Sequence, residues 1–453
     1  MYDHLRRYFS DEISFLFESA STSEGNFSFI NIGALEHLEY KESTTIYTDA
    51  EGRSKKLDIS PFEFLKSYYK KIDTKAYKDQ SKALNVGYID GFIGMVGFDA
   101  VKVFEPKLCL AMDDLEDQLH IPDIDLIRPR FSLVFSHKEQ KVTLLSPLKD
   151  MADQFDAIEA MLKSNYDHIP LKTYSNYEEG KFSFDKERFF DMIAKSKEMI
   201  LSGDVFQILM ANRYQQKCDI DPFSFYRVLR SKNPSPYMFL MQYKDYNVVG
   251  SSPEVMVGLQ NNEILLRPIA GTRKRGDTPQ RDHELEIEMI NDPKECAEHL
   301  MLVDLGRNDV GRVAKVGTVK VHDMMHVERY SHVMHMVSDV TATLDENHDM
   351  FDLFAATFTA GTMTGAPKIR AMELIAEFEG IKRSFYSGSI AYFGFNGDMD
   401  SAITIRTALI KDDVITLQAG AGIVADSQPE LEYLEVTNKL GALKSSLEDL
   451  KEA

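Results

Sequence analysis

Apolar and polar positions recur along this chain with both helical and strand periods. Residues 183–202 place their large apolar side chains roughly on one helical face, with Asp185 positioned to cap the helix and Gly203 to end it. Residues 204–215 then alternate with a period of two, as in a strand. This part of the chain therefore predicts a helix that leads directly into a strand.

Two later helices have recognisable start signals. Asp292, Pro293 and Glu295 stand at the N-cap, first and third positions of a long helix with many apolar residues. Residues 427–430 repeat this kind of pattern. We therefore expect Ser427 to open the final helix with a capping box, in which side chains and backbone amides satisfy one another.

Three further segments have the pattern of strands. Residues 326–344 are expected to form one strand, and residues 414–424 another. Residues 387–410 predict a hairpin, because Asn396 and Gly397 suit a type I′ turn. Hairpins mixed with long helices favour an antiparallel α+β architecture over a doubly wound parallel sheet.

Composition places the domain boundary in residues 151–183, where a helical pattern runs into a polar stretch. Short strand-like runs dominate before it, and chemistry-bearing motifs are denser after it. We expect an N-terminal part in residues 1–150, a connecting segment in residues 151–183 and a catalytic part in residues 184–450.

Composition excludes several classes of function. Lys and Arg total 52 and Asp and Glu total 72, a net charge of −20, which argues against nucleic acid or an anionic membrane as the main partner. Cys109, Cys218 and Cys296 lie far apart, which excludes a disulfide framework and a zinc knuckle and indicates a reducing compartment. The 453 residues show no secretory pattern and no long apolar run, so we expect a cytoplasmic protein without membrane spans.

Three glutamates are candidates for a metal site. Glu298 lies in an apolar helical run, where a buried carboxylate needs a cation or hydrogen-bond donors; a salt bridge to Lys or Arg is the ordinary alternative. Glu432 and Glu435 share one face of the last helix with Lys439, which by itself is typical of a solvated acidic surface. Glu298 and Glu435 together could hold Mg²⁺, but the sequence does not bring their helices together.

A histidine and an arginine are the other candidates for chemistry. His335 lies in an apolar strand near His322, His326 and His332, and could act as a general acid or base or simply be structural. No zinc-ligand spacing accompanies it. Arg406 is expected in a strand, on a face of small residues, where it could grip a carboxylate; a surface arginine is the alternative.

Three glycine loops offer free backbone amides to an anion. They are PIAGT at residues 268–272, GTMTGAPK at residues 361–368 and QAGAG at residues 418–422. The second is not a P-loop, because Ala366 and Pro367 stand where that motif needs Gly and Lys. With the acids and the arginine, the loops indicate a small carboxylate-bearing substrate and Mg²⁺.

Residues 184–443 resemble the chorismate-utilising enzymes. The resemblance rests on the ordered motifs GDVFQ, SSPE, PIAGTRKRG, NDPKECAEHLMLVDLGRND, SHVMHMVS, AGTMTGAPKIRAMELI, AITIRTA, QAGAGIV and ELEYLEVTNK. It implies an α+β fold with large antiparallel sheets packed as a sandwich and surrounded by helices. Gln207 stands where isochorismate-forming members place a lysine, and Ala270 where aminodeoxychorismate-forming members typically place one. Both residues are those of the anthranilate synthase large-subunit branch.

The resemblance implies that residues 1–150 are the regulatory, tryptophan-binding part and residues 184–450 the chorismate-binding, catalytic part, and it also implies residue roles. Glu298 and Glu435 match magnesium ligands, with Glu432 and Lys439 close by, and His335 matches the general acid/base. Thr362 and Gln207 also match the catalytic set. The positions that match chorismate-binding residues are Gly271, Thr272, Tyr386, Arg406, Gly420, Ala421 and Gly422. The segments FLFESA and NPSPYMF match a tryptophan-binding site, through Glu18, Ser19, Pro236, Tyr237 and Met238. Two motifs depart from the family: Ala211-Asn212-Arg213 where SQR is frequent, and LEVTNK where DETRNK is common.

By this resemblance the chain converts chorismate and ammonia to anthranilate and pyruvate, the first step of tryptophan biosynthesis, with Mg²⁺ as cofactor and L-tryptophan as feedback inhibitor. No cysteine lies in the glycine-flanked turn that a glutaminase nucleophile needs, so ammonia is expected from a separate glutamine amidotransferase subunit, component II. The alternatives are an aminodeoxychorismate synthase component I, an isochorismate synthase and a non-catalytic amino-acid-sensing subunit.

Overall fold

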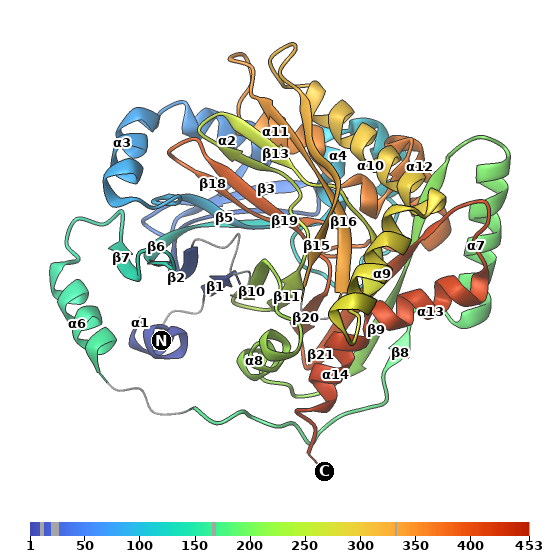
Figure 1. Ribbon diagram of the computed structural model, residues 1–453. Helices are drawn as coiled ribbons and strands as arrows, with labels where there is room; N and C mark the ends of the chain where they lie inside the picture. Colours follow the sequence, from blue (N-terminus) through green and yellow to red (C-terminus); the bar gives the residue numbers. More distant parts are fainter. Residues whose placement is uncertain (10–12, 20–26, 165–168, 331–332, 453) are drawn as a thin grey trace.

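The computed structural model describes residues 1–9, 13–19, 27–164, 169–330 and 333–452 (Figure 1). Its strands form one large hydrogen-bonded sheet with antiparallel pairing between neighbouring strands, and helices surround it. The predicted antiparallel α+β architecture is therefore confirmed. In the described part of the chain, no helix has both the length and the apolar character that crossing a membrane requires.

Two long strands connect the two branches of this sheet. β2 (Phe27–Lys41) and β6 (Ile124–Ser136) pair with each other along most of their length. Their register shifts just after Gly33, which has a φ of 71°, as expected where a bulge bends a strand. Before the bend β2 pairs with β1 (Ser14–Glu18), and after it with β3 (Thr44–Thr48).

Each branch continues through strands that are distant in sequence. The first branch runs, in order of pairing, through β1, β10 (Tyr237–Gln242), β11 (Asn247–Ser252), β20 (Thr407–Lys411), β21 (Val414–Ile423) and β9 (Gln207–Lys217). The second runs from β6 through β5 (Gly91–Val96), β18 (Ser389–Gly394), β19 (Met399–Ile403), β12 (Gly258–Gln260), β13 (Glu263–Leu266) and β16 (Val333–Thr343), which also pairs with β14 (Ile269–Lys274) and β15 (Lys320–Arg329). Shorter strands are β4 (Ser54–Leu57), β7 (Lys141–Leu145), β8 (Lys181–Phe182) and β17 (Gly365–Ala366).

The helices pack outside the strands. They are α1 (Tyr2–Phe9), α2 (Pro61–Tyr69), α3 (Thr74–Leu84), α4 (Val101–Phe104), α5 (Cys109–Met112), α6 (Ala152–Lys163), α7 (Lys186–Leu201), α8 (Pro222–Lys232), α9 (Pro279–Ile290), α10 (Pro293–Gly311), α11 (Met350–Thr357), α12 (Lys368–Glu379), α13 (Pro429–Lys439) and α14 (Gly441–Glu448). Both α7 and α13 lie on the side of β9 and β21 (Figure 1). Strands of residues 1–150 and 184–450 pair directly, β1 with β10 and β5 with β18. The three-part division of the chain stays a prediction.

Local signals located several elements correctly. The predicted helix at residues 183–202 is α7, and the Asp185 side chain accepts a hydrogen bond of 2.8 Å from the Arg188 amide. The strand that follows is β9, and residues 414–424 form β21. Asp292 caps α10, where its side chain accepts from the backbone of residues 294 and 295. These features depend only on neighbouring residues, which is why they can be predicted without tertiary information.

Three local predictions are wrong. Residues 326–344 are not one strand, because β15 turns back as β16 and pairs Glu328 with His335; alternation continues on both sides of a turn and does not reveal it. The Asn396–Gly397 turn is not type I′, because that turn needs positive φ at both residues and only Gly397, at 84°, has it. Ser427 does not cap α13, since its hydroxyl accepts from the Val424 amide instead, and Gln428 occupies the N-cap.

Candidate active site

The site forms where the chain crosses between the two branches of the sheet. β19 ends at Ile403 and β20 begins at Thr407, so the prediction that Arg406 lies within a strand is wrong. Arg406 has a φ of 52°, an uncommon conformation for a residue with a side chain. A chain that passes from one branch of the sheet to the other turns sharply at such a corner.

A second crossing, between β11 and β12, lies against the first. The Arg406 carbonyl accepts a hydrogen bond of 3.1 Å from the Ser251 amide, and the Glu254 carbonyl accepts one of 3.0 Å from the Ile403 amide. These backbone contacts place Glu254 beside the Arg406 corner. The two crossings therefore bring an acidic and a basic side chain to one point.

Glu254 is a functional candidate that sequence reasoning did not single out. Its only signal was the SSPE motif, in which it carried no assigned role. Its side chain is buried, and the Thr362 hydroxyl donates a hydrogen bond of 2.9 Å to its Oε1. Burial raises the pKa of Glu254 to about 7, even though Thr362, Lys439 and Arg406 favour the charged form. Near neutral pH it can therefore hold a proton and release it.

Two glycines of β21 allow side chains to approach its backbone. A Cβ atom at Gly420 would lie 3.1 Å from the Tyr386 hydroxyl oxygen, and one at Gly422 would lie 2.7 Å from the Gln207 amide nitrogen. Glycine is required where side chains come this close to a strand. Ala421 lies between them and is fully buried. Gly420 and Gly422 thus form a floor beneath Tyr386 and Gln207.

The two side chains over this floor are polar but uncharged. Burial raises the pKa of Tyr386 to about 12, so its hydroxyl keeps its proton. Gln207 is buried, and its Oε1 has no hydrogen-bond partner among the residues that the structure describes. A buried carbonyl oxygen without a donor is unfavourable and can accept a hydrogen bond from a ligand.

His335 lies in β16 opposite a bulge in β14. The pairing shifts between Ala270 and Thr272, and Gly271 at the bulge has a φ of 61°. His335 Nδ1 lies 3.2 Å from the Gly271 carbonyl oxygen and 3.0 Å from the Thr272 hydroxyl. Because a carbonyl oxygen only accepts, the first contact favours a proton on Nδ1 and leaves Nε2 free to accept one. Burial lowers the pKa of His335, and the charge of Arg406 lowers it further.

Tertiary packing brings the acids of α10 and α13 into electrostatic contact. Burial raises the pKa of Glu298, and the charges of Glu295 and Glu435 raise it further. Burial and the charge of Glu435 likewise raise the pKa of Glu432. Carboxylates that disfavour one another's charge are relieved by a cation between them, and oxygen donors of this kind suit Mg²⁺. The chemistry of these oxygen donors therefore suits a magnesium ion.

Lys439 and Arg406 tie α13 to the floor of the site. Lys439 Nζ lies 2.7 Å from Glu435 Oε1 and donates a hydrogen bond of 2.9 Å to the Gly420 carbonyl. Arg406 Nη1 donates one of 3.0 Å to the Lys439 carbonyl. Among the other histidines of the predicted cluster, His322 pairs with Asp339 in the sheet, His326 contacts Glu328, and His332 lies outside the described residues.

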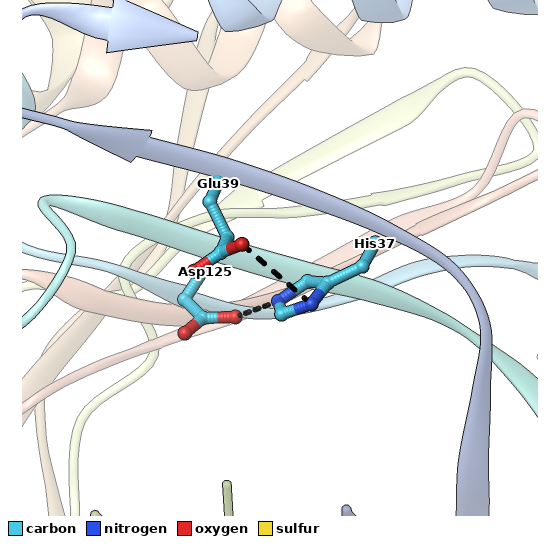
Figure 2. A group of neighbouring side chains, drawn as sticks. All are labelled: His37, Glu39 and Asp125. Atoms are coloured by element: carbon cyan, nitrogen blue, oxygen red, sulfur yellow. Dashed lines mark hydrogen bonds and ion pairs between the residues drawn. The ribbon is translucent and has the colours of Figure 1, made fainter. Parts of the chain in front are cut away.

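A separate acid–histidine group lies on β2 and β6. Figure 2 shows the His37 ring facing both Asp125 and Glu39, with His37 Nε2 at 2.6 Å from Asp125 and Nδ1 at 3.9 Å from Glu39. Of the described residues, these three form the one compact group of potential metal ligands. Asp125 also accepts a hydrogen bond of 2.7 Å from the Tyr246 hydroxyl. Burial opposes a charged His37, but the Asp125 carboxylate raises its pKa, so this is an ion-pair cluster with its partners in place.

The residues predicted to bind tryptophan line one cavity of about 250 Å³. All five, namely Glu18, Ser19, Pro236, Tyr237 and Met238, contribute to its wall, together with aromatic residues and Asp400. Arg230 lies 2.9 Å from Glu18, and the Tyr237 hydroxyl donates a hydrogen bond of 3.2 Å to Asp400. Burial raises the pKa of Asp400 to about 6. The cavity thus combines apolar walls with two carboxylates.

Comparison with known proteins gives consistent matches. The model of the chorismate binding enzyme family matches residues 15–445. Anthranilate synthase component 1 of Aquifex aeolicus is 40% identical over 98% of this chain and 90% of its own, and that of Acetivibrio thermocellus is 38% identical over 99% and 92%. The crystal structure of anthranilate synthase component I from Streptococcus pneumoniae superposes with a TM-score of 0.79 at 30% identity, covering 93% of each chain.

Proposed function

Because the chain belongs to the chorismate-binding enzyme family, we propose that it is the chorismate-converting subunit of an anthranilate synthase, a lyase that turns chorismate and ammonia into anthranilate and pyruvate. The observation that carries the proposal is the meeting of Arg406 and Glu254 at the sheet crossing, beside the acids of α10 and α13. It combines a carboxylate-binding cation, a proton donor and oxygen ligands for a metal in one place.

Substrate binding is assigned to Arg406 and to the open edge of β21. β20 pairs with β21 only as far as Leu417, so the amides of Gly420 and Gly422 have no β20 partner on that side. A guanidinium together with backbone amides suits a carboxylate. We propose that they hold the enolpyruvyl carboxylate, with Tyr386 and Thr272 at the substrate's polar groups.

Glu298 and Glu435 are proposed to hold Mg²⁺, with Glu432 and Lys439 beside them. Bound there, Mg²⁺ would neutralise the ring carboxylate of chorismate and lower the energy of charge that develops as the ring hydroxyl leaves. Lys439 Nζ lies 2.7 Å from Glu435 Oε1, so a cation of the chain already stands beside this proposed ligand.

Two proton-transfer groups follow from the pKa directions. Glu254, protonated near pH 7 and hydrogen-bonded to Thr362, would donate its proton to the departing ring hydroxyl. His335, neutral because burial lowers its pKa, would move a proton at Nε2 during the loss of pyruvate. The two groups have opposite tasks because their environments raise the pKa of Glu254 and lower the pKa of His335 from their ordinary values.

Gln207 supports ammonia, rather than activated water, as the nucleophile. An amide does not act as a base, so it does not activate water as a lysine at this position would. Its unpaired Oε1 can accept a hydrogen bond from ammonia and hold it over the glycine floor. Ammonia itself is proposed to come from a glutamine amidotransferase partner, in the reducing cytoplasm that three unpaired cysteines favour.

The product formed from chorismate tests this function. The purified chain with Mg²⁺ and ammonium should release anthranilate, identified by fluorescence and mass, and should release none when glutamine replaces ammonium. The reason is that the described cysteines are either buried, as Cys218, or placed in helical turns, as Cys109 and Cys296, without a glutaminase arrangement. A para-amino product, isochorismate, or glutamine-dependent turnover by the chain alone would contradict the proposal.

The cavity beside β1 and β10 is proposed to bind tryptophan as an inhibitor. Its apolar wall suits an indole ring, and Glu18 can pair with the amino group. Replacing Glu18 with Gln should raise the tryptophan concentration for half-inhibition at least about tenfold, since a charge-assisted hydrogen bond is lost. Activity without tryptophan should change less than about twofold. In the exposed control Glu51→Gln, both this activity and the half-inhibiting tryptophan concentration should change less than about twofold. Unchanged inhibition in Glu18→Gln would remove this residue from the site.

A further inference from the structure

A buried ion pair lies directly behind the groups proposed to act on chorismate. Glu379, the last residue of α12, and Arg383, four residues later, each expose 1% of the side chain. Arg383 Nε lies 2.9 Å from Glu379 Oε2 and Nη2 lies 2.6 Å from Oε1, a bidentate contact. Burying two charges is costly, and an apolar pair of similar size is often at least as stable. This pair therefore calls for a reason beyond stability.

Arg383 also binds the backbone of two segments that carry site residues. Its Nη1 donates a hydrogen bond of 2.9 Å to the Met363 carbonyl, next to Thr362. Its Nη2 donates one of 2.8 Å to the Leu209 carbonyl, two residues after Gln207 in β9. One planar guanidinium thus spans the distance between the Thr362 turn and the β9 strand.

Glu379 completes the connection from the other side. Its Oε1 accepts a hydrogen bond of 2.9 Å from the Ala211 amide, also in β9. The Arg383 carbonyl accepts one of 3.2 Å from the Tyr386 amide, and the guanidinium stacks 4.9 Å from the ring centre of Phe98. The pair consequently contacts the backbone supports of Thr362 and Gln207, and the Arg383 guanidinium lies 5.9 Å from the ring centre of Tyr386 itself.

We propose that Arg383, oriented by Glu379, is a positioning residue that sets the distance between Thr362 and Gln207. This rests on the proposed function, because it concerns the Thr362–Glu254 proton donor and the Gln207 amide, both of which are proposed to act on the substrate. Arginine suits the task because its fork donates in fixed directions to two carbonyls and a carboxylate at once. A lysine would keep the charge and lose that geometry.

The test compares two matched arginines. Arg128 also forms a bidentate contact, at 2.9 and 2.6 Å with Asp90, and stacks 4.9 Å from Phe395, but it contacts no site residue. Arg383→Lys should lower kcat for anthranilate about 100-fold, the loss expected from a displacement near 1 Å, while the chorismate dissociation constant changes less than about threefold. Arg128→Lys should lower the melting temperature comparably and leave kcat unchanged.

Each outcome bears on a different statement. If the wild-type chain makes no anthranilate, the proposed function fails; if it does and Arg383→Lys keeps its kcat, the positioning role fails. Equal losses of kcat in both arginine variants would also overturn it, since stability alone would then explain them. Should Arg383→Lys not fold, Glu379→Gln keeps an acceptor for the Ala211 amide and should still lower kcat about tenfold through a loosened Arg383.

Discussion

Glu298→Gln is expected to abolish turnover, lowering kcat/KM by at least about 10³-fold at saturating Mg²⁺. The substitution keeps the size of the side chain and removes the charge that a hard cation needs from its ligands. Electrostatic stabilisation by a metal contributes several kcal/mol to a transition state, and each 1.4 kcal/mol corresponds to about tenfold in rate. The measurement is the rate of anthranilate formation as a function of Mg²⁺ concentration.

The control for this variant lies on the same helix. Asp304 is exposed on α10 and pairs with Arg307 at 2.8 Å, so Asp304→Asn removes a charge without reaching the site. It should leave kcat/KM and the Mg²⁺ dependence within about twofold, the small effect expected of a surface pair. Wild-type Mg²⁺ dependence in Glu298→Gln would remove Glu298 from the metal site.

The second large effect is a bell-shaped dependence of kcat/KM on pH. His335 must be neutral to accept a proton, and its pKa is lowered from 6.5, so activity should fall only as pH drops below that value. Glu254 must be protonated to donate, and its pKa is about 7, so activity should also fall as pH rises through 7. The maximum is therefore expected between the two pKa values, slightly on the acid side of neutrality.

Two variants separate the limbs of this profile. Glu254→Gln should lower kcat/KM by about 10²- to 10⁴-fold and remove the alkaline limb, because an amide neither donates the proton nor titrates. His335→Ala should slow the loss of pyruvate and allow the amino intermediate to accumulate, as detected by mass. An alkaline limb that persists in Glu254→Gln, or anthranilate formed by His335→Ala at the wild-type rate, would show that the group in question has another role.

Much of the fold could be predicted from neighbouring residues, and the two failures in strand prediction share one cause. Asp185 and Asp292 cap their helices as expected because an N-cap involves only the next few residues. The reversal between β15 and β16 and the corner at Arg406 were missed, since alternation looks the same whether a strand continues or turns. Ser427 had the right residue type for a cap but bonds to Val424 instead.

The candidate site was also predictable only in part: its residues could be singled out, but their arrangement could not. Glu298, His335 and Arg406 were singled out because their residue types are unusual in apolar or small-residue surroundings. Their mutual arrangement was not predictable, since α10, β16 and the β19–β20 corner are joined only by long-range packing. Glu254 was not singled out at all, because its pKa depends on burial that no local pattern reports.

The sequence by itself therefore determined the chemistry available to this protein: which acids, bases and glycines it carries, where helices begin, and to which family its motifs belong. Only the tertiary structure decided which of these groups meet. In the tertiary structure the β11–β12 and β19–β20 connections lie together and place Arg406 beside Glu254. α13 packs on β21, and Arg383 lies behind the site. The physical reason is that capping and periodicity act over a few residues, whereas burial, charge coupling and hydrogen-bond geometry depend on segments that are far apart in the sequence.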